Sequence, residues 1–317
     1  MAQQTPEEIA HARLVEAMAV TFGDEFTALF DDPKIVEIVL NADCQVLVER
    51  LGEGFSRFGK LSPNESRNIM NLVASWLGII TDSENPVVEG ALPLEFGRAR
   101  FEGLLPPLVD NPSFAIRLRA RSIFTLADYV AKNIMSENQA SVVKDSVRKR
   151  KNILVSGGTG SGKTTLLNAV LQEISEQSDL DSRVIIIEDT NELQCKAENS
   201  LQLLTSKNVN MTHLLKATMR LRPDRIVVGE VRDGAALALL KAWNTGHPGG
   251  AATVHANNPK SALVRLDNLC QESGVPSQKI LIDEAVDLIL QIERAPESPA
   301  GRRISEIYDV KNQSIVV

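Results

Sequence analysis

The sequence predicts an α/β fold, in which a C-terminal domain with a mainly parallel sheet follows a smaller α+β domain. From residue 152 onward, short aliphatic runs alternate with stretches of helical period, which is typical of a parallel sheet covered by helices. Before residue 125, β-like runs separated by turn residues lie between helical segments. The chain has 317 residues, of which 43% are hydrophobic, and this length suits two domains with separate cores.

The α+β domain is expected to occupy residues 1–124. Apolar residues recur with helical period over residues 5–30, and Ser62 followed by Pro63 is a start signal for a helix that reaches about Ile80. Turn residues separate short β-like runs at Ile35–Leu40, Gln45–Glu49, Phe55–Gly59, Ala99–Leu105 and Phe114–Ala120. These runs predict a small meander sheet beside the helices.

Residues 125–150 are expected to form a helical linker between the domains. The segment reads as two helical pieces, Leu126–Ile134 and Glu137–Arg150, and the break at Ser136 is a candidate hinge. The basic run at residues 148–151 is interpreted as a solvated helix end, because cations suit the helix dipole there. A contact with an anionic surface is the alternative for this run.

The parallel-sheet domain is expected at residues 151–317. Strands are predicted at the aliphatic runs Ile153–Val155, Val184–Ile187, Ile226–Val228 and Ala252–Val254. Helices are predicted in the intervening stretches Lys163–Gln177, His213–Leu221, Asp233–Asn244 and Pro259–Ser273. A terminal β addition is predicted at Leu288–Glu293 and Arg303–Val310.

Residues 157–164 match the pattern G-x-x-x-x-G-K-[ST] in full, between a predicted strand and a predicted helix. In this context the backbone N–H groups of the loop curl around a phosphate, and the helix N-terminus adds partial positive charge. Lys163 would reach the outer phosphates, and the Thr164 hydroxyl would bind Mg²⁺. The residues expected to bind the nucleotide are Gly158, Thr159, Gly160, Ser161, Gly162, Lys163, Thr164 and Thr165. A chance glycine-rich turn ending in Lys-Thr is the alternative.

Acidic residues follow two of the predicted strands. Glu188 and Glu192 follow the first of these strands, and Glu230 follows the second. Ligands of a parallel sheet bind at the C-terminal strand ends, where such acids could orient or deprotonate the water that attacks a phosphate. Glu230 has the position of a Walker B acid that would meet the Mg²⁺ shell. Solvated loop residues or helix caps are the alternative for acids after a strand.

Two arginines and two histidines lie near the same strands. Arg220 and Arg222 could neutralise charge on a transferring phosphoryl group, with surface ion pairs as the alternative. His247 and His255 lie in one glycine-rich segment, where a polar sensor of the terminal phosphate is a reasonable role. A zinc pair lacks a nearby third ligand, and a structural or solvent-facing role is the alternative for each histidine.

The composition argues against several classes of protein. A net charge of −7 and an aromatic content of 4% disfavour a dedicated nucleic-acid binder, so direct nucleic-acid binding is not expected. Cys44, Cys195 and Cys270 are far apart and form neither a disulfide framework nor a zinc site. A signal peptide and an apolar run of about 18 residues are both missing, so we expect a cytoplasmic protein whose membrane contact is peripheral.

Four ordered motifs make the chain resemble the secretion-superfamily ATPases, which include type II secretion, type IV secretion and type IV pilus motors. The motifs are a Walker A loop at 157–164, an Asp box at 188–192, a Walker B segment at 222–233 and a His box at 245–257. The match covers roughly residues 90–290. The short N-terminal domain, the stretch at 98–107 and the lack of a tetracysteine motif resemble the conjugation and type IV secretion branch.

The resemblance implies a RecA-like P-loop domain after a PAS-like N-terminal domain, with one nucleotide site between the two. It implies a hexameric ring that hydrolyses ATP with Mg²⁺ and powers pilus assembly or substrate transfer. Such a motor would lie on the cytoplasmic face of the inner membrane, bound to secretion or conjugation components. A type IV pilus or type II secretion motor, a single-stranded DNA motor and a nucleotide-gated scaffold that barely hydrolyses ATP are the alternatives.

The same resemblance assigns roles to residues of the C-terminal domain. Lys163 and Thr164 hold the phosphates and Mg²⁺, and Glu230 holds the metal environment, partly through water. Glu192 is the first candidate for activating the attacking water, and Glu188 is the second.

Further roles fall to histidines and arginines. His255 and His247 would report the nucleotide state, and Arg220 or Arg222 would assist the N-terminal arginines that reach the phosphates. Arg117 is the best match for an N-terminal arginine that reaches the phosphates, and its competitors are Arg98, Arg100, Arg119 and Arg121. Closure of the two domains would then depend on the phosphate, and hydrolysis would open them at the hinge.

Overall fold

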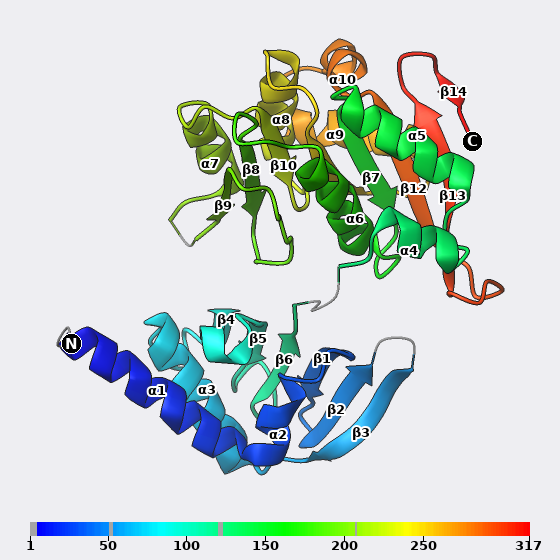
Figure 1. Ribbon diagram of the computed structural model, residues 1–317. Helices are drawn as coiled ribbons and strands as arrows, with labels where there is room; N and C mark the ends of the chain where they lie inside the picture. The colour runs from blue at the N-terminus through cyan, green and yellow to red at the C-terminus, as the bar shows by residue number, and fades with distance from the viewer. Residues whose placement is uncertain (1–4, 51–52, 120–122, 207) are drawn as a thin grey trace. The chain divides into compact units, whose positions relative to one another are not determined.

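The computed structural model describes residues 5–50, 53–119, 123–206 and 208–317. The chain divides into two compact units, Met1–Ser122 and Ile123–Val317 (Figure 1). The first unit carries an antiparallel sheet with helices, and the second carries a mainly parallel sheet with helices. The predicted fold class is thereby confirmed.

The described strands of the first unit form one antiparallel sheet in the order β3-β2-β1-β6-β5-β4. Their bounds are β1 Ile35–Leu40, β2 Gln45–Arg50, β3 Gly54–Lys60, β4 Val87–Ala91, β5 Arg100–Leu104 and β6 Ser113–Arg117. Strands β1 to β3 and β4 to β6 are each a meander, and the pairing of β1 with β6 joins them. The sequence pattern predicts these strands, except for β4, and a meander sheet, but it does not predict the pairing of β1 with β6.

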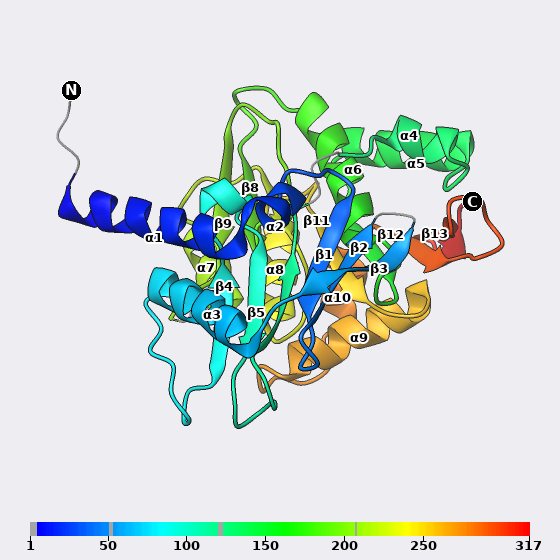
Figure 2. The same cartoon turned by 90° about the horizontal axis from the view of Figure 1, so that it is seen from below.

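Helices of the first unit share a core with this sheet. They are α1 Pro6–Phe22, α2 Asp24–Leu29, α3 Pro63–Leu77 and the 3-10 helix η1 Leu94–Phe96. Capping boxes at Thr5 and Ser62 begin α1 and α3, which lie side by side (Figure 2). The helix predicted over residues 5–30 is broken at Gly23, whose φ of 76° lies in the left-handed region that glycine tolerates.

The described strands of the second unit form one sheet in the order β14-β13-β12-β7-β11-β10-β8-β9. Their bounds are β7 Ile153–Gly157, β8 Val184–Glu188, β9 Ser200–Leu204, β10 Arg225–Val228, β11 Ala251–His255, β12 Leu288–Arg294, β13 Arg302–Asp309 and β14 Ser314–Ile315. The strands from β12 to β9 in this order are parallel, and β13 and β14 add antiparallel pairs at one edge. The sequence pattern predicts this sheet except for β9 and β14.

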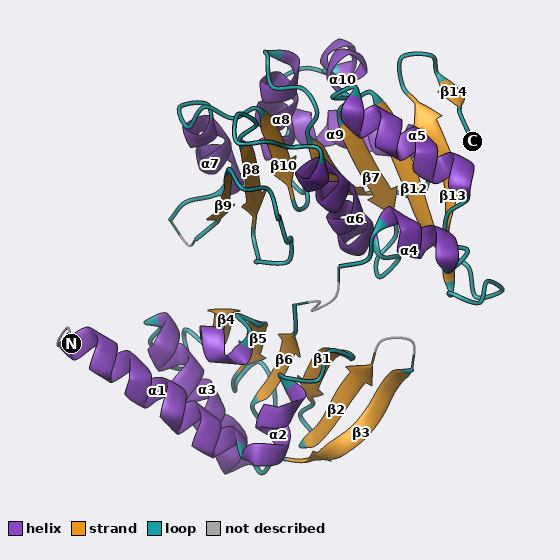
Figure 3. Ribbon diagram, in the orientation of Figure 1, coloured by secondary structure: helices purple, strands orange, loops and turns teal. Residues whose placement is uncertain are grey.

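Helices pack against the parallel sheet in two separate cores (Figure 3). Their bounds are α4 Leu126–Ala131, α5 Glu137–Arg148, α6 Lys163–Glu176, α7 Met211–Thr218, α8 Ala235–Asn244, α9 Pro259–Gln271 and α10 Lys279–Ala285. Ile153 and Val155 of β7 face the core of α4 to α6, whereas Leu154 faces that of α7 to α10, because strand side chains alternate between faces. Within the described ranges, no helix combines the length and the apolar character that crossing a bilayer requires.

The segment expected as a helical linker forms α4 and α5. Tyr129 and Val143 are buried in the core that these helices share with β7. Ser136, the candidate hinge, is the N-cap of α5, and its hydroxyl accepts a hydrogen bond from the backbone N–H of Gln139. Both helices therefore pack as part of the second unit, while residues 120–122 lie outside the described residues.

Asn152 ties together the edge of the sheet where the parallel strands begin, and it is 4% exposed. Its Oδ1 accepts hydrogen bonds from the N–H groups of Gly249 and Gly250 at 2.8 and 3.0 Å. Its Nδ2 donates to the carbonyl of Ala285 at 2.8 Å, and its backbone N–H donates to Asp287 Oδ2 at 2.8 Å. One residue thereby links the starts of β7, β11 and β12.

Asn152→Ala is expected to lower the free energy of unfolding of the second unit by about 2–4 kcal/mol, because buried N–H groups and a carbonyl lose their partner. Denaturation followed by Trp243 fluorescence in a Trp76→Phe background measures this, since Trp243 is buried in the second unit. The control is Asn312→Ala at an exposed asparagine, which should change the value by less than about 0.5 kcal/mol. An equally small change for Asn152→Ala would contradict its structural role.

Candidate nucleotide-binding site

The predicted phosphate loop joins β7 to α6. Every residue of β7 is buried, and α6 begins at Lys163 directly after the loop. Gly160 and Gly162 have φ values of 67° and 103°, in the left-handed region that favours glycine. Gly162, the N-cap of α6, offers no side-chain hydrogen bond to the helix. The first N–H groups of α6 are therefore available to a ligand, and the helix dipole favours an anion there.

Polar side chains of the loop suit a nucleotide phosphate. Nζ of Lys163 donates to the carbonyl of Gly158 at 3.1 Å, which holds the ammonium group at the loop. Thr164 and Thr165 are half-buried in the first turn of α6. Ser161 is 1% exposed, and its buried Oγ has no hydrogen-bond partner among the residues that the structure describes, which is unusual for a buried hydroxyl. A bound phosphate would supply that partner.

Glu188 ends β8 and is only 2% exposed. Its carboxylate accepts hydrogen bonds from the N–H groups of Glu192 and Leu193 at 3.0 and 2.8 Å, and from the side-chain amide of Gln202. Burial raises the pKa of the Glu188 carboxyl above its usual value, while these donors act in the opposite sense. Of the two acids predicted to activate water, Glu188 is enclosed and holds the loop, and Glu192 is half-buried.

Asn168 on α6 fixes the same loop from a second element, and it is 4% exposed. Its Nδ2 donates to the carbonyl of Glu192 at 3.2 Å, and its Oδ1 accepts from the N–H of Gln194 at 2.8 Å. The sequence prediction omits Asn168, although a polar residue among the buried apolar residues of α6 is a signal for it. The backbone on both sides of Glu192 is therefore fixed by β8 and by α6.

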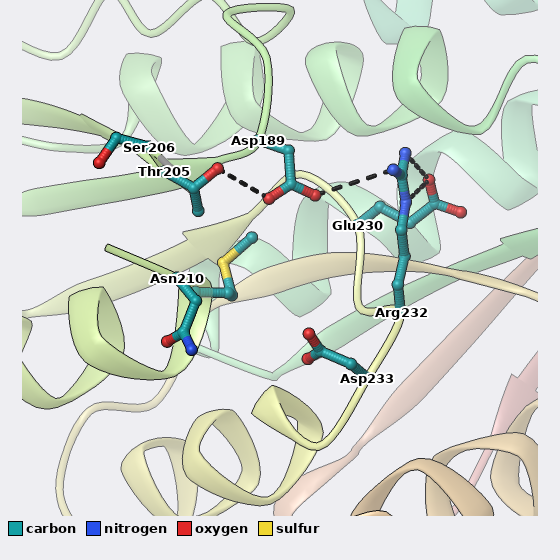
Figure 4. A pocket seen from close by; sticks show the side chains of 8 residues that line it. Asp189, Thr205, Ser206, Asn210, Glu230, Arg232 and Asp233 are labelled. Carbon is teal, nitrogen blue, oxygen red and sulfur yellow. Dashed lines mark hydrogen bonds and ion pairs between the residues drawn. The ribbon is translucent and has the colours of Figure 1, made fainter. Parts of the chain in front are cut away.

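Glu230 lies just beyond β10 in a polar pocket with Arg232 and Asp189 (Figure 4). Nε and Nη2 of Arg232 donate to Oε2 of Glu230 at 2.9 and 2.7 Å. Nη1 of Arg232 lies 3.8 Å from Oδ2 of Asp189, whose Oδ1 accepts from the Thr205 hydroxyl at 3.0 Å. Arg232 thus orients Glu230 through one carboxylate oxygen. Neither Arg232 nor Asp189 is among the site residues predicted from sequence.

The pocket around Glu230 has the chemistry that Mg²⁺ prefers. Its volume is about 150 Å³, and it is lined by Asp189, Thr205, Ser206, Asn210, Met211, Glu230, Arg232 and Asp233. Within the described ranges, no group of three or more His, Cys, Asp or Glu residues is arranged to hold a metal. Mg²⁺ is usually held by one or two carboxylate-linked contacts together with phosphates and waters. Glu230 and Asp189 supply carboxylates of this kind in the pocket, whereas Thr164 is not among the residues that line it, so the shared Mg²⁺ site of Thr164 and Glu230 stays a prediction.

The strand order gathers the phosphate loop, Glu188, Glu230 and His255 at one edge of the sheet. Strands β7, β11, β10 and β8 are neighbours and parallel, so the residues after their C-terminal ends share that edge. His255 ends β11 and pairs in register with Gly157, where the phosphate loop begins. A Cβ on Gly229, after β10, would lie 3.1 Å from Cγ of Glu188 at the end of β8.

The structure places Arg220, Arg222 and His247 elsewhere. All three precede β10 or β11, and therefore lie at the edge where these parallel strands begin. Nδ1 of His247 lies 2.8 Å from the carbonyl oxygen of Pro223, and both arginines are exposed. The structure does not bring these residues to the phosphate loop of the same chain, and their roles stay predictions.

Arg117 ends β6 in the first unit, where it pairs in register with Glu37 of β1 and Arg100 of β5. Its side chain is exposed. Its competitor Arg121 lies outside the described residues. A contact between Arg117 and a nucleotide phosphate stays a prediction.

Comparisons with known proteins show the family of this chain. The family model described as type II/IV secretion system protein matches residues 95–309. The chain is 49% identical over 302 residues to conjugal transfer protein TrbB of Rhizobium radiobacter, covering 95% of this chain and 92% of the relative. It is 29% identical over 342 residues to type IV secretion system protein VirB11 of Bartonella quintana, covering 92% and 93% of the two chains.

A solved structure shares the fold. The Legionella pneumophila ATPase DotB matches with a TM-score of 0.62 and 20% identity, covering 97% of this chain and 81% of that chain. Together with the phosphate loop and the acids at the same sheet edge, these similarities confirm the resemblance. The chain belongs to the type II/IV secretion system protein family.

Proposed function

We propose that this chain is an Mg²⁺-dependent ATPase that works as a ring-shaped motor of type IV secretion or conjugative transfer. The observation that carries the proposal is the common sheet edge of the phosphate loop, the Glu192 loop, Glu230 and His255. The similarity to the conjugal transfer relative extends over nearly the whole of both chains, which supports the same cellular role.

The phosphate loop would bind the triphosphate through backbone N–H groups and the N-terminus of α6. Lys163 would neutralise charge on the outer phosphates. Thr164 and Glu230 would hold Mg²⁺, which when bound withdraws charge from the phosphoryl group. Arg232 would keep the Glu230 carboxylate turned toward this site through its paired hydrogen bonds at 2.9 and 2.7 Å.

Glu192 would orient or deprotonate the attacking water. Glu188 and Asn168 hold its backbone through hydrogen bonds to the N–H and the carbonyl, which limits the region that its carboxylate can reach. Glu188 acts by positioning, because its carboxylate is buried and occupied by hydrogen bonds from the protein. His255, in register with Gly157, would respond to the terminal phosphate.

Arginines that lie away from the C-terminal ends of the parallel strands would couple hydrolysis to motion of the two units. Arg117 of the first unit would bind the nucleotide held by the second unit, so that closure depends on the phosphate. Arg220, Arg222 and His247 could serve a nucleotide only in a neighbouring subunit, because their own phosphate loop lies at the other sheet edge.

We propose a hexameric ring, peripheral on the cytoplasmic face of the inner membrane and bound there to secretion or conjugation components. Its substrate would be moved by the repeated opening and closing of the subunits, without direct nucleic-acid binding by this chain. The net charge of −7 supports a partner other than nucleic acid.

Lys163→Ala is expected to abolish ATP hydrolysis, because the outer phosphates lose their cation. A phosphate-release assay measures the rate. Lys260→Ala, at an exposed lysine of α9, is the matched control and should keep the wild-type rate. Hydrolysis by Lys163→Ala at the wild-type rate would place the active site elsewhere.

Glu192→Gln is expected to lower kcat by about 10²–10⁴-fold, because the attacking water loses its base. Its melting temperature and its affinity for a non-hydrolysable ATP analogue should stay at the wild-type values. Glu188→Gln should lower both the melting temperature and kcat. The N–H groups of Glu192 and Leu193 donate to Oε1 and the Gln202 amide donates to Oε2, so an amide nitrogen at either position would face a donor. If Glu188→Gln slows hydrolysis and Glu192→Gln keeps the wild-type rate, the assignment of Glu192 is wrong.

Ring assembly is expected to accompany nucleotide binding. Sedimentation velocity with and without a non-hydrolysable ATP analogue, followed by a phosphate-release assay on the same sample, measures both. We expect the active fraction to sediment as a hexamer. A monomer that hydrolyses ATP at the full rate would contradict the ring while leaving the ATPase activity intact.

A further inference from the structure

Two arginines lie opposite each other on the hairpin of β12 and β13. Arg294 ends β12, Arg302 begins β13, and the two are partners in the antiparallel register. Directly opposed residues of two antiparallel strands project from the same face of the sheet. We refer to Arg294 and Arg302 as the hairpin arginine pair.

The hairpin arginine pair contacts the phosphate loop. Nε of Arg294 donates to the carbonyl of Gly160 at 3.4 Å, and its Nη2 occupies the space that a Cβ on Gly160 would need. Nη1 of Arg302 lies 2.7 Å from the position of a Cβ on Gly162. Both guanidinium groups therefore lie against the glycines that form the phosphate cradle.

The pair lacks an acidic partner. Among the described residues, neither guanidinium forms an ion pair with an N···O distance of 4.0 Å or less. The adjacent Arg303, by contrast, is paired with Glu293 at 2.8 Å and with Glu297 at 3.5 Å. Like charges directly opposite on neighbouring strands are destabilising, so an anion between the pair would relieve the repulsion.

The position of the pair indicates which part of a nucleotide it would meet. Strand β7 has β11 on one side and β12 on the other. His255, which is expected at the terminal phosphate, ends β11, and Glu230, which is expected at Mg²⁺, follows the neighbouring β10. The pair lies at the end of β12 and the start of β13, so it approaches the loop from the side away from the terminal phosphate.

We propose that the hairpin arginine pair binds the α- and β-phosphates of the nucleotide. This inference rests on the proposed function and deepens it. Arginine suits the role because its planar fork can donate two hydrogen bonds to one phosphate. ADP keeps both of these phosphates after hydrolysis. The pair therefore sets the affinity for ADP and ATP alike, in contrast to Glu192 and His255, which act on the terminal phosphate.

The test measures binding by isothermal titration calorimetry with ADP and with a non-hydrolysable ATP analogue, each with Mg²⁺, on the full chain. Arg294→Ala and Arg302→Ala should each raise the Kd for both nucleotides by about 10–100-fold, because a charge-assisted hydrogen bond is lost. In turnover assays KM should rise by a similar factor while kcat at saturating ATP changes little. Arg303→Ala, which removes a neighbouring arginine paired with acids, is the control and should bind as the wild type does.

Lysine variants test whether weaker binding by the alanine variants comes from the lost guanidinium group or from misfolding. Arg294→Lys and Arg302→Lys keep the charge and the aliphatic stem but lose the fork, so their Kd values should lie between those of the wild type and the alanine variants. Equal Kd values for the wild type and all pair variants would overturn the inference, as would weakened binding of the ATP analogue with unchanged binding of ADP. If the wild type itself bound neither nucleotide, the proposed function would fail.

Discussion

The parallel alignment of β7, β11, β10 and β8 is the constraint on which the rest of the site depends. Because these strands run in one direction, the segments that follow them emerge at one edge, and groups far apart in sequence meet there. Lys163, Glu230 and Glu192 each follow a different strand of this set, and His255 ends the fourth. The same alignment explains why Arg220, Arg222 and His247, which precede their strands, lie at the other edge.

Buried polar side chains hold the loops at both edges. Asn152 joins three strand starts at one edge, while Glu188 and Asn168 fix the segment that carries Glu192 at the other. Each of these side chains is at most 4% exposed, and each is fully engaged with backbone groups or amides. A buried polar group that forms its hydrogen bonds in only one loop conformation favours that conformation over others. These residues therefore define the loop geometry, which non-directional apolar packing does not.

Patterns within one segment of sequence predict much of this fold. Aliphatic runs located β7, β8, β10 and β11, and the glycine pattern at 157–164 located the phosphate loop. The helix break at Gly23 and the strands β4 and β9 were missed, since their determinants are a single backbone conformation and pairing with distant strands. Asn168 was missed for the same kind of reason, because the loop residues that it binds, Glu192 and Gln194, come from another element.

The hairpin of β12 and β13 extends this argument to the phosphate loop itself. Glycine at 160 and 162 is usually explained by positive φ and by the approach of a phosphate to the backbone. Here a side chain at either position would also displace a guanidinium group of Arg294 or Arg302. The loop is therefore confined by an element that follows it by more than a hundred residues. Since β12 pairs with β7, any shift of the hairpin would be transmitted to the cradle that holds the nucleotide.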